Sequence, residues 1–206
     1  MKKFLIGTTL VLLLSSAVSL QSVEAASQTY TVVSGDTLWK IAQKHQVGVS
    51  ELIQANSQLS NPNLIYPGQK VNIPGQAPGR AFEQEVVRLV NVERTKNGLK
   101  PLKENWELSR VARVKSAEMA NKGYFSHTSP TYGSPFDMMK SFGIRYSTAG
   151  ENIAYGQRTA AEVMRGWMNS AGHRKNILNP NFTEIGVGYA TNSKGTPYWT
   201  QMFIKP

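Results

Sequence analysis

The sequence contains no cysteine among its 206 residues. This absence excludes disulfide bonds, and it excludes lipid attachment at an N-terminal cysteine. Exported proteins use disulfides often but do not require them, so the absence does not argue against export. The folded chain must be held together by its hydrophobic core alone.

Long apolar runs are also scarce, and the one that occurs stands at the N-terminus. Lys2 and Lys3 precede a mostly apolar run over residues 4–20, and a small-residue cleavage pattern follows at residues 23–25. We therefore expect residues 1–26 to be a signal peptide. An uncleaved anchor is the alternative, but it needs about 20 consecutive apolar residues, and Ser15, Ser16 and Ser19 interrupt this run. The sequence predicts a secreted protein with no transmembrane segment after signal cleavage.

Acidic residues are few, because 23 Lys and Arg face 13 Asp and Glu for a net charge of +10. The excess lies in residues 83–206, which carry 17 basic and 10 acidic residues. A basic surface attracts polyanions, and no nucleic-acid-binding motif accompanies the charge. We expect an anionic wall polymer or membrane surface as partner, and no nucleic acid.

Residues 28–73 have the pattern of a small β-α-α-β unit. A β-branched and aromatic run at residues 30–33 predicts a strand, and apolar residues at helical spacing follow from Thr37. Ser50 is a candidate cap for a second helix, and residues 69–73 alternate as a closing strand. Residues 75–81 are rich in Pro and Gly, which predicts a linker between two separately folded domains.

Two motifs in this unit carry a family resemblance: YTVVSGDTLWKIA at residues 30–42 and NLIYPGQKVNIP at residues 63–74. Together they resemble a LysM domain, over residues 28–74. The resemblance implies binding of N-acetylglucosamine polymers such as peptidoglycan or chitin. In that family the sugar lies between the loop after the first strand and the loop before the second. Carried over, the glycan-binding residues are Gly35, Asp36, Thr37, Leu38, Asn63, Leu64 and Ile65.

Such a groove is physically reasonable in this sequence. Backbone amides and carbonyls of a Gly-containing turn can bond an N-acetyl group, while Leu38 or Ile65 packs against its methyl and ring face. The alternative is that residues 35–37 only cap the following helix, and the two roles are compatible. Because the sequence contains one copy of the module, we expect weak binding, roughly micromolar to millimolar.

Residues 82–206 begin with helical periodicity and end with alternating strands. Helix starts are indicated at Asn105, at residues 134–137 and at residues 159–162. The period then changes to two over residues 185–189 and 199–203, with a hairpin turn at residues 192–195. Residues 152–155 are a candidate short strand. The pattern predicts an α+β fold, in which helices flank a small antiparallel sheet.

Five motifs fall in order along this region: FSHTSP at residues 125–130, AGENIA at 149–154, GWMNSAGHR at 166–174, NIL at 176–178 and YWTQ at 198–201. They resemble the CAP superfamily of cysteine-rich secretory proteins, antigen 5 and pathogenesis-related 1 proteins, in its bacterial form. The resemblance implies an α-β-α sandwich over residues 82–206. In that family two His and two Glu line a central cleft, and some members bind zinc through the histidines. His127, Glu151 and His173 fit three of the four positions, whereas Asn169 and Ser170 stand where the second Glu is expected.

These three residues allow several kinds of chemistry. A His-His-Glu set can hold catalytic zinc with water in the open position, His127 and His173 being the metal ligands. Glu151 and one histidine can instead share acid–base duties without a metal. The third alternative is a polar network that only rigidifies the fold.

The sequence therefore predicts a secreted protein of the cell wall or spore envelope. LysM would bind peptidoglycan or another N-acetylglucosamine polymer, and the CAP domain would act as an effector or binding domain. One alternative is a hydrolase of wall peptide or glycan that uses the His/Glu cleft. The other is a structural component of a spore or wall layer.

Overall fold

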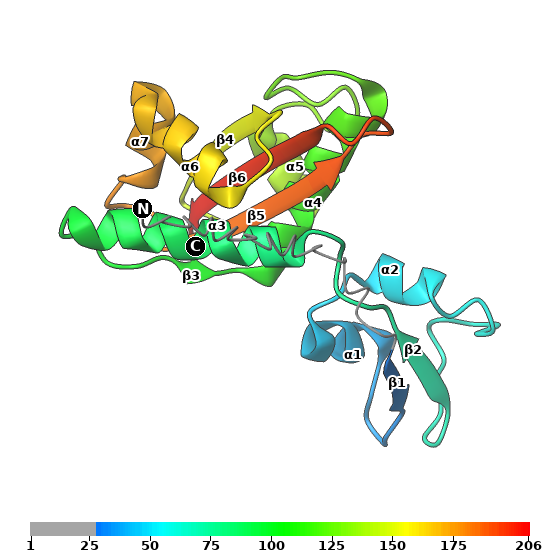
Figure 1. Ribbon diagram of the computed structural model, residues 1–206. Coiled ribbons are helices and arrows are strands. Elements are labelled where there is room, and N and C mark those ends of the chain that lie inside the picture. The colour runs from blue at the N-terminus through cyan, green and yellow to red at the C-terminus, as the bar shows by residue number, and fades with distance from the viewer. Residues whose placement is uncertain (1–27) are drawn as a thin grey trace, which may run out of the picture.

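The computed structural model describes residues 28–206, which form two mixed α/β units joined by a short connection (Figure 1). The expected signal peptide lies outside the described residues. Among residues 28–206, no helix has the length and apolar character needed to cross a membrane.

The first unit has the predicted β-α-α-β order. Its elements are β1 (Gln28–Thr31), α1 (Leu38–His45), α2 (Val49–Gln54) and β2 (Lys70–Ile73). β1 and β2 pair antiparallel, with Gln28 opposite Ile73. Both helices and β2 contribute to one small core of eight buried apolar residues: Val32, Leu38, Ile41, Ala42, Leu52, Leu59, Val71 and Ile73.

The two helix starts of this unit differ. Thr37 caps α1 as expected, because its Oγ1 accepts from Lys40 N at 3.2 Å. The predicted cap at Ser50 is wrong, since Gly48 is the N-cap of α2 and Ser50 lies inside the helix. A Cβ on Gly48 would lie 1.8 Å from Glu51 Oε2 and 2.8 Å from Arg110 Cδ. The folded-back Glu51 side chain and Arg110 therefore occupy the place of a capping side chain.

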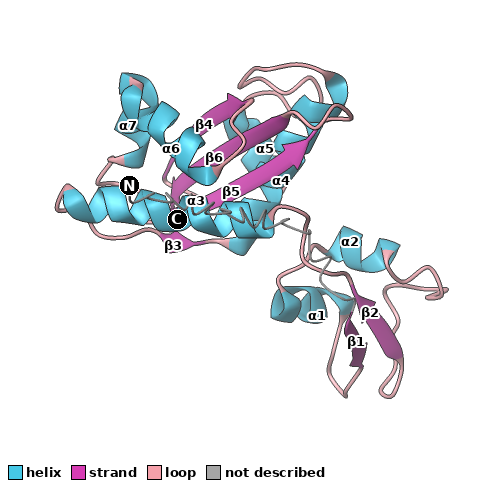
Figure 2. Ribbon diagram, viewed as in Figure 1, coloured by secondary structure: helices cyan, strands magenta, loops and turns pink. Residues whose placement is uncertain are grey.

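The second unit contains five helices and four strands. They are α3 (Arg80–Lys96), β3 (Lys103–Glu104), α4 (Trp106–Lys122), α5 (Pro135–Ser141), β4 (Thr148–Tyr155), α6 (Ala160–Asn169), α7 (Ala171–Ile177), β5 (Glu184–Thr191) and β6 (Pro197–Lys205). The sheet order is β3-β5-β6-β4, with β3 parallel to β5 and the other pairs antiparallel (Figure 2). β4 is consequently an edge strand.

Helices cover both faces of this sheet, which confirms the α-β-α sandwich (Figure 1). Residues of α3, α6 and α7 pack on one face, and residues of α4 and α5 pack on the other. β6 alternates between them, because Trp199 and Phe203 join the first layer while Met202 and Ile204 join the second.

Two glycines of β5 set the spacing between the sheet and α4. A Cβ on Gly186 would lie 2.3 Å from the backbone carbon of Leu108, and one on Gly188 would lie 2.1 Å from that of Ala112. The α4 backbone therefore rests directly on the sheet, since only glycine leaves room for it.

Several boundaries differ from the sequence prediction. β4 starts at Thr148 rather than at residue 152, and β3 and α7 were not predicted. α3 begins at Arg80, so the last two residues of the expected linker are helical. Arg80 is fixed there because its guanidinium pairs with Glu104 and lies 3.6 Å from the buried Glu83.

Candidate functional site

The backbone segments that border the two LysM loops predicted to hold glycan are hydrogen-bonded to each other. Val32 N donates to Gln69 O at 2.9 Å, and Gly68 N donates to Val32 O at 2.8 Å. These bonds join the end of the first strand to the turn that leads into β2. Gly35 turns the first loop with a φ of 85°, a conformation that favours glycine.

Polar groups of the first loop are mostly engaged within the loop itself. The Asp36 carboxylate accepts from Val33 N at 2.9 Å and from Tyr30 Oη at 2.8 Å, and these two bonds lower the pKa of Asp36. Gly35 O accepts from Lys40 Nζ at 2.7 Å. Thr37 provides the helix-capping role considered for residues 35–37. The Asp36 carboxylate instead stabilises the loop through its two hydrogen bonds.

Exposed apolar side chains surround these loops, but they are not all the expected ones. Of the two side chains expected to pack on a sugar, Leu38 or Ile65, Leu38 is only 4% exposed and belongs to the core. Ile65 is partly buried against the same core. Leu64, one of the expected residues, is 52% exposed. Val33 and Tyr66, which were not among the predicted glycan-binding residues, are 56% and 60% exposed. Their signal in the sequence is an apolar residue next to each turn.

In the second unit, His127 and Glu151 form a direct pair. Nδ1 of His127, in the loop after α4, lies 2.7 Å from Oε1 of Glu151, on β4. The Glu151 side chain is 2% exposed, whereas that of His127 is 53% exposed. Burial raises the pKa of Glu151, while the His127 bond and the charge of Lys115 oppose that rise. Glu151 Oε2 is buried and has no hydrogen-bond partner among the described residues.

His173 is brought to the same place by α7, which packs against the open edge of β4. The side chain of Asn152 donates to His173 O at 3.1 Å, and the side chain of Asn176 donates to Glu151 O at 3.1 Å. Burial and the neighbouring His127 lower the pKa of His173. The structure therefore brings together His127, Glu151 and His173, which lie far apart in the sequence.

Lys115 is a member of this site that the sequence reasoning missed. Its side chain is fully buried, and Nζ donates to Tyr124 Oη at 3.1 Å and to His127 O at 3.0 Å. Burial lowers the pKa of Lys115, and the charges of Glu151 and Glu118 oppose this. The available signal was a lysine on the apolar face of a predicted helix, four residues after Val111 and four before Met119.

Glu118 anchors the loop that carries His127. Its carboxylate accepts from Ser129 Oγ at 2.5 Å, from Tyr124 Oη at 2.7 Å and from Lys122 Nζ at 3.0 Å, and it also bonds Thr131. Burial alone would raise the pKa of Glu118, but these bonds outweigh it and lower the pKa to about 2. Glu118 is a second buried carboxylate beside the site, but its bonds commit it to holding the loop.

The positions where the family places its second Glu serve a different purpose in this chain. Asn169 is the last residue of α6, and Ser170 ends α6 and starts α7. Ser170 N donates to Trp167 O at 3.2 Å, and Arg174 N donates to Ser170 O at 2.8 Å. The junction supplies a sharp turn between helices and no carboxylate.

His127 and His173 are the candidate zinc ligands. Glu151 is turned to Nδ1 of His127, and residues 28–206 contain no group of three or more His, Cys, Asp or Glu side chains arranged to hold a metal ion. Catalytic zinc generally has three protein ligands, and here one oxygen of Glu151 is already bonded to His127.

The arrangement is suited to proton transfer without a metal. While Glu151 is ionised it accepts a hydrogen bond, so Nδ1 of His127 carries the proton and Nε2 is left with a free lone pair. The exposed imidazole can then take a proton at Nε2, and the buried carboxylate stabilises the imidazolium that results.

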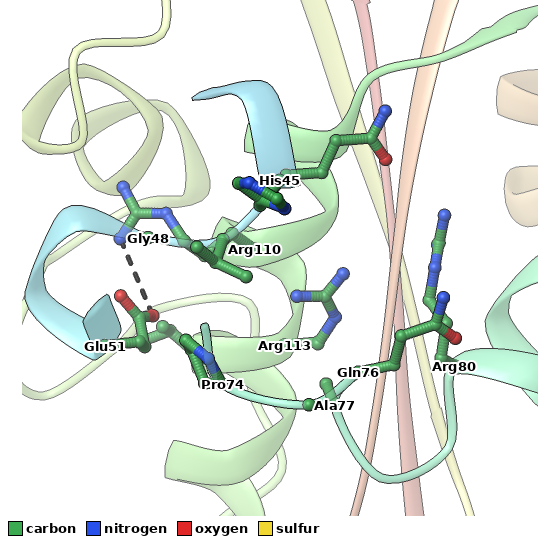
Figure 3. Close-up of a pocket in the computed structure, with 13 residues that line it drawn as sticks. His45, Gly48, Glu51, Pro74, Gln76, Ala77, Arg80, Arg110 and Arg113 are labelled. Carbon is green, nitrogen blue, oxygen red and sulfur yellow. Dashed lines mark ion pairs between the residues drawn. The ribbon is translucent and has the colours of Figure 1, made fainter. Parts of the chain in front are cut away.

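A cavity of about 270 Å³ lies between the two units, away from this site (Figure 3). Residues of α1 and α2, the linker and the start of α3 and α4 line it, and Arg110 Nη1 lies 3.9 Å from Glu51 Oε1 across it. His45 Nε2, Glu51 Oε2 and Arg110 Nε are buried there without a hydrogen-bond partner among the described residues. Water can satisfy such groups, and the cavity is large enough to hold several molecules.

Comparison with known proteins agrees with this architecture. Residues 87–203 match the Cysteine-rich secretory protein family, CAP, and residues 30–74 match the LysM domain. The protein YkwD of Bacillus subtilis (strain 168) is 61% identical over 138 residues, which are 66% of this chain and 52% of YkwD. The probable autolysin SsaALP of Staphylococcus aureus is 50% identical over 50 residues, which are 24% of this chain and 18% of that protein.

The crystal structure of an extracellular protein containing a SCP domain from Bacillus anthracis superposes with a TM-score of 0.58 at 34% identity. The match covers 68% of this chain and 47% of that one, so the chain spans about half the length of YkwD and of this extracellular protein. The family match covers more than half of the chain, and the fold is the one that the family has. This chain belongs to the cysteine-rich secretory protein (CAP) family and carries a LysM domain in front of its CAP domain.

Proposed function

We propose that this protein is secreted to the cell wall, that it binds peptidoglycan or a related N-acetylglucosamine polymer through the LysM loops, and that it presents the CAP domain there as an effector. The observation that carries this proposal is the joined pair of LysM loops, with Val33, Leu64 and Tyr66 half-exposed beside backbone turns. LysM domains bind such glycans, and a pyranose offers an apolar face to exposed side chains of this kind.

Titration of the full chain with a soluble N-acetylglucosamine tetramer tests the proposal. The wild type should bind with a Kd in the roughly micromolar-to-millimolar range. Leu64→Ala combined with Tyr66→Ala should weaken binding about tenfold, because both side chains lose their contact with the sugar. Gln54→Ala is the matched control, since Gln54 is an exposed residue at the end of α2. Equal affinity of the double variant and the wild type would contradict the proposal.

A second function, hydrolysis of wall peptide or glycan, is favoured by the His127–Glu151 pair. A buried carboxylate that holds an exposed imidazole by Nδ1 is an arrangement suited to general-base catalysis. On this account Nε2 of His127 takes a proton from water as the water attacks the scissile bond, and the resulting imidazolium returns the proton to the leaving group.

Release of soluble fragments from purified peptidoglycan tests this second function. His127→Ala should lower the rate of fragment release at least about 100-fold, because general acid–base catalysis usually contributes a factor of about 10²–10⁴. No release by the wild type under any metal condition would rule out hydrolysis and leave the binding role. Site variants that fold and still behave like the wild type in binding and in release would favour a structural role in a wall or spore layer.

A further inference from the structure

Three aromatic rings form one continuous group on the α4 side of β4. The ring centroids of Phe125 and Tyr155 are 4.7 Å apart with a tilt of 55°, and those of Tyr155 and Tyr198 are 5.8 Å apart in a stacked arrangement. Phe125 is 46% exposed and Tyr155 is 52% exposed, whereas Tyr198 is buried in the core. Two exposed rings are therefore supported from behind by a buried one.

This aromatic pair lies on the same loop and strand as the His127–Glu151 pair. Phe125 precedes His127 by two residues, and Tyr155 follows Glu151 by four along β4. Because alternate residues of a strand share a face, Glu151 and Tyr155 project to the same side, roughly 13 Å apart. The loop and the strand are thus bridged at one end by His127–Glu151 and at the other by Phe125–Tyr155.

The fold does not account for leaving these two rings half in water. Burying an aromatic side chain stabilises a protein, and aromatic side chains that stay together at the surface can mark an interaction site. Phe136 is the only other large apolar side chain of the CAP domain that is strongly exposed among the described residues.

We infer that Phe125 and Tyr155 form a sugar-stacking subsite of the CAP domain, which takes a pyranose ring of the same N-acetylglucosamine polymer that the LysM loops bind. This rests on the proposed function. The apolar face of the ring packs on the two aromatic faces, and its hydroxyl and acetamido groups turn toward water. A lipid would need a larger contiguous apolar surface, and this patch gives way within a few residues to the polar pair.

Attachment through the LysM domain makes a weak subsite effective. A polymer that is held by the LysM loops presents further repeat units to the CAP domain at a raised local concentration. The aromatic subsite can therefore be occupied even when its own affinity is low. Its occupation places the neighbouring sugar beside His127.

The test is an NMR titration of the labelled full chain with the N-acetylglucosamine tetramer, because it reports each domain separately. We expect signals of Leu64 and Tyr66 to shift first, and signals of Phe125, Tyr155 and His127 to shift with at least a fivefold higher midpoint. Phe125→Ala combined with Tyr155→Ala should remove the second set of shifts and keep the first. Phe136→Ala is the matched control, since Phe136 is 44% exposed on α5, and it should keep both sets.

The possible failures are distinguishable. Shifts confined to the LysM signals would overturn the subsite and leave the proposed LysM function intact, whereas no shift in either domain would overturn both. Shifts at Phe125 and Tyr155 with phosphatidylglycerol vesicles, but not with the tetramer, would overturn the sugar assignment in favour of a lipid.

Discussion

The LysM and CAP domains differ in the polar groups that they bury. Asn56 is the one buried polar residue of the LysM domain, and it joins α2 to β2 by accepting from Asn72 N and donating to Asn72 O, each at 2.7 Å. The CAP domain buries five charged residues: Glu83, Arg94, Lys115, Glu118 and Glu151.

This difference indicates two ways of building a site. The candidate LysM site is made of exposed loops whose polar groups are already bonded to each other, and the small core beneath it holds no charge. The CAP domain keeps its acid–base pair in position with buried ionic groups, which are costly to desolvate and depend on their partners. The stability of the CAP domain should therefore depend on charge and pH far more than that of the LysM domain.

The largest effect is expected from Lys115→Ala. The substitution removes the buried ammonium between Glu118 and Glu151 and leaves the Tyr124 and His127 acceptors unbonded. Each buried acceptor left without a partner costs about 1–3 kcal/mol. The CAP domain should therefore unfold at a much lower denaturant concentration, while the unfolding midpoint of the LysM domain stays unchanged. Residue-resolved amide exchange measures both. Lys96→Ala is the control, because it breaks an exposed ion pair and should cost under about 1 kcal/mol of stability. An equally small loss of stability in Lys115→Ala would contradict the predicted difference between the two domains.

The next largest difference in stability is expected between alanine substitutions at two glycines, one in each domain. Gly188→Ala places a Cβ 2.1 Å from the α4 backbone, and overpacking of this severity should destabilise the CAP domain by about 3 kcal/mol. Gly68→Ala in the LysM domain meets nothing within 4 Å and is disfavoured only by its φ of 86°, which costs about 1 kcal/mol. Chemical denaturation of the two variants should preserve this order, and the reverse order would contradict the close packing of α4 on the sheet.

Acid should destabilise the CAP domain through Glu118. Its pKa is about 2 in the folded state against 4.5 normally, so its stabilising effect is complete above about pH 4.5 and is lost as the pH falls toward 2. Glu118→Gln should flatten the decline of CAP stability across this window, as measured by the unfolding midpoint at each pH. An unchanged decline would show that other carboxylates govern acid unfolding.

The smallest effect is expected at the contact between the domains. The Arg110–Glu51 pair is loose at 3.9 Å, so Arg110→Ala should change the stability of either domain by less than about 0.5 kcal/mol. It should nevertheless loosen the mutual orientation of the domains, because Arg110 also packs on Gly48 of the LysM domain. Small-angle X-ray scattering should report a larger radius of gyration, and an unchanged profile would argue that the linker alone sets the orientation.

Local patterns predicted most of the fold, because caps and periodicity act within a few residues. At the predicted start of α5, Ser134 and Asp137 form a complete reciprocal capping box. At the predicted start of α6, Thr159 Oγ1 accepts from Glu162 N, but the Glu162 carboxylate accepts from Arg158 N instead of from Thr159 N. β3 is two residues long, and its pairing with β5 depends on contacts distant in the sequence. Short-range pattern cannot reveal such an element.

The candidate CAP site was predicted in part for the same reason. His127, Glu151 and His173 were found through motif resemblance, but nothing local indicates that Glu151 faces Nδ1 of His127 rather than a metal. Lys115 and the aromatic pair of Phe125 and Tyr155 need the tertiary structure, which brings α4, the following loop and β4 together.

Co-sedimentation with purified peptidoglycan measures whether the LysM loops hold the protein on the wall. Leu64→Ala with Tyr66→Ala should lower retention several-fold in high salt, while His127→Ala should leave it unchanged. In low salt the loss should be smaller, because the basic CAP domain, with 17 basic and 10 acidic residues over 83–206, adds electrostatic attraction that salt screens. Retention of the double LysM variant at the wild-type level in high salt would contradict the account.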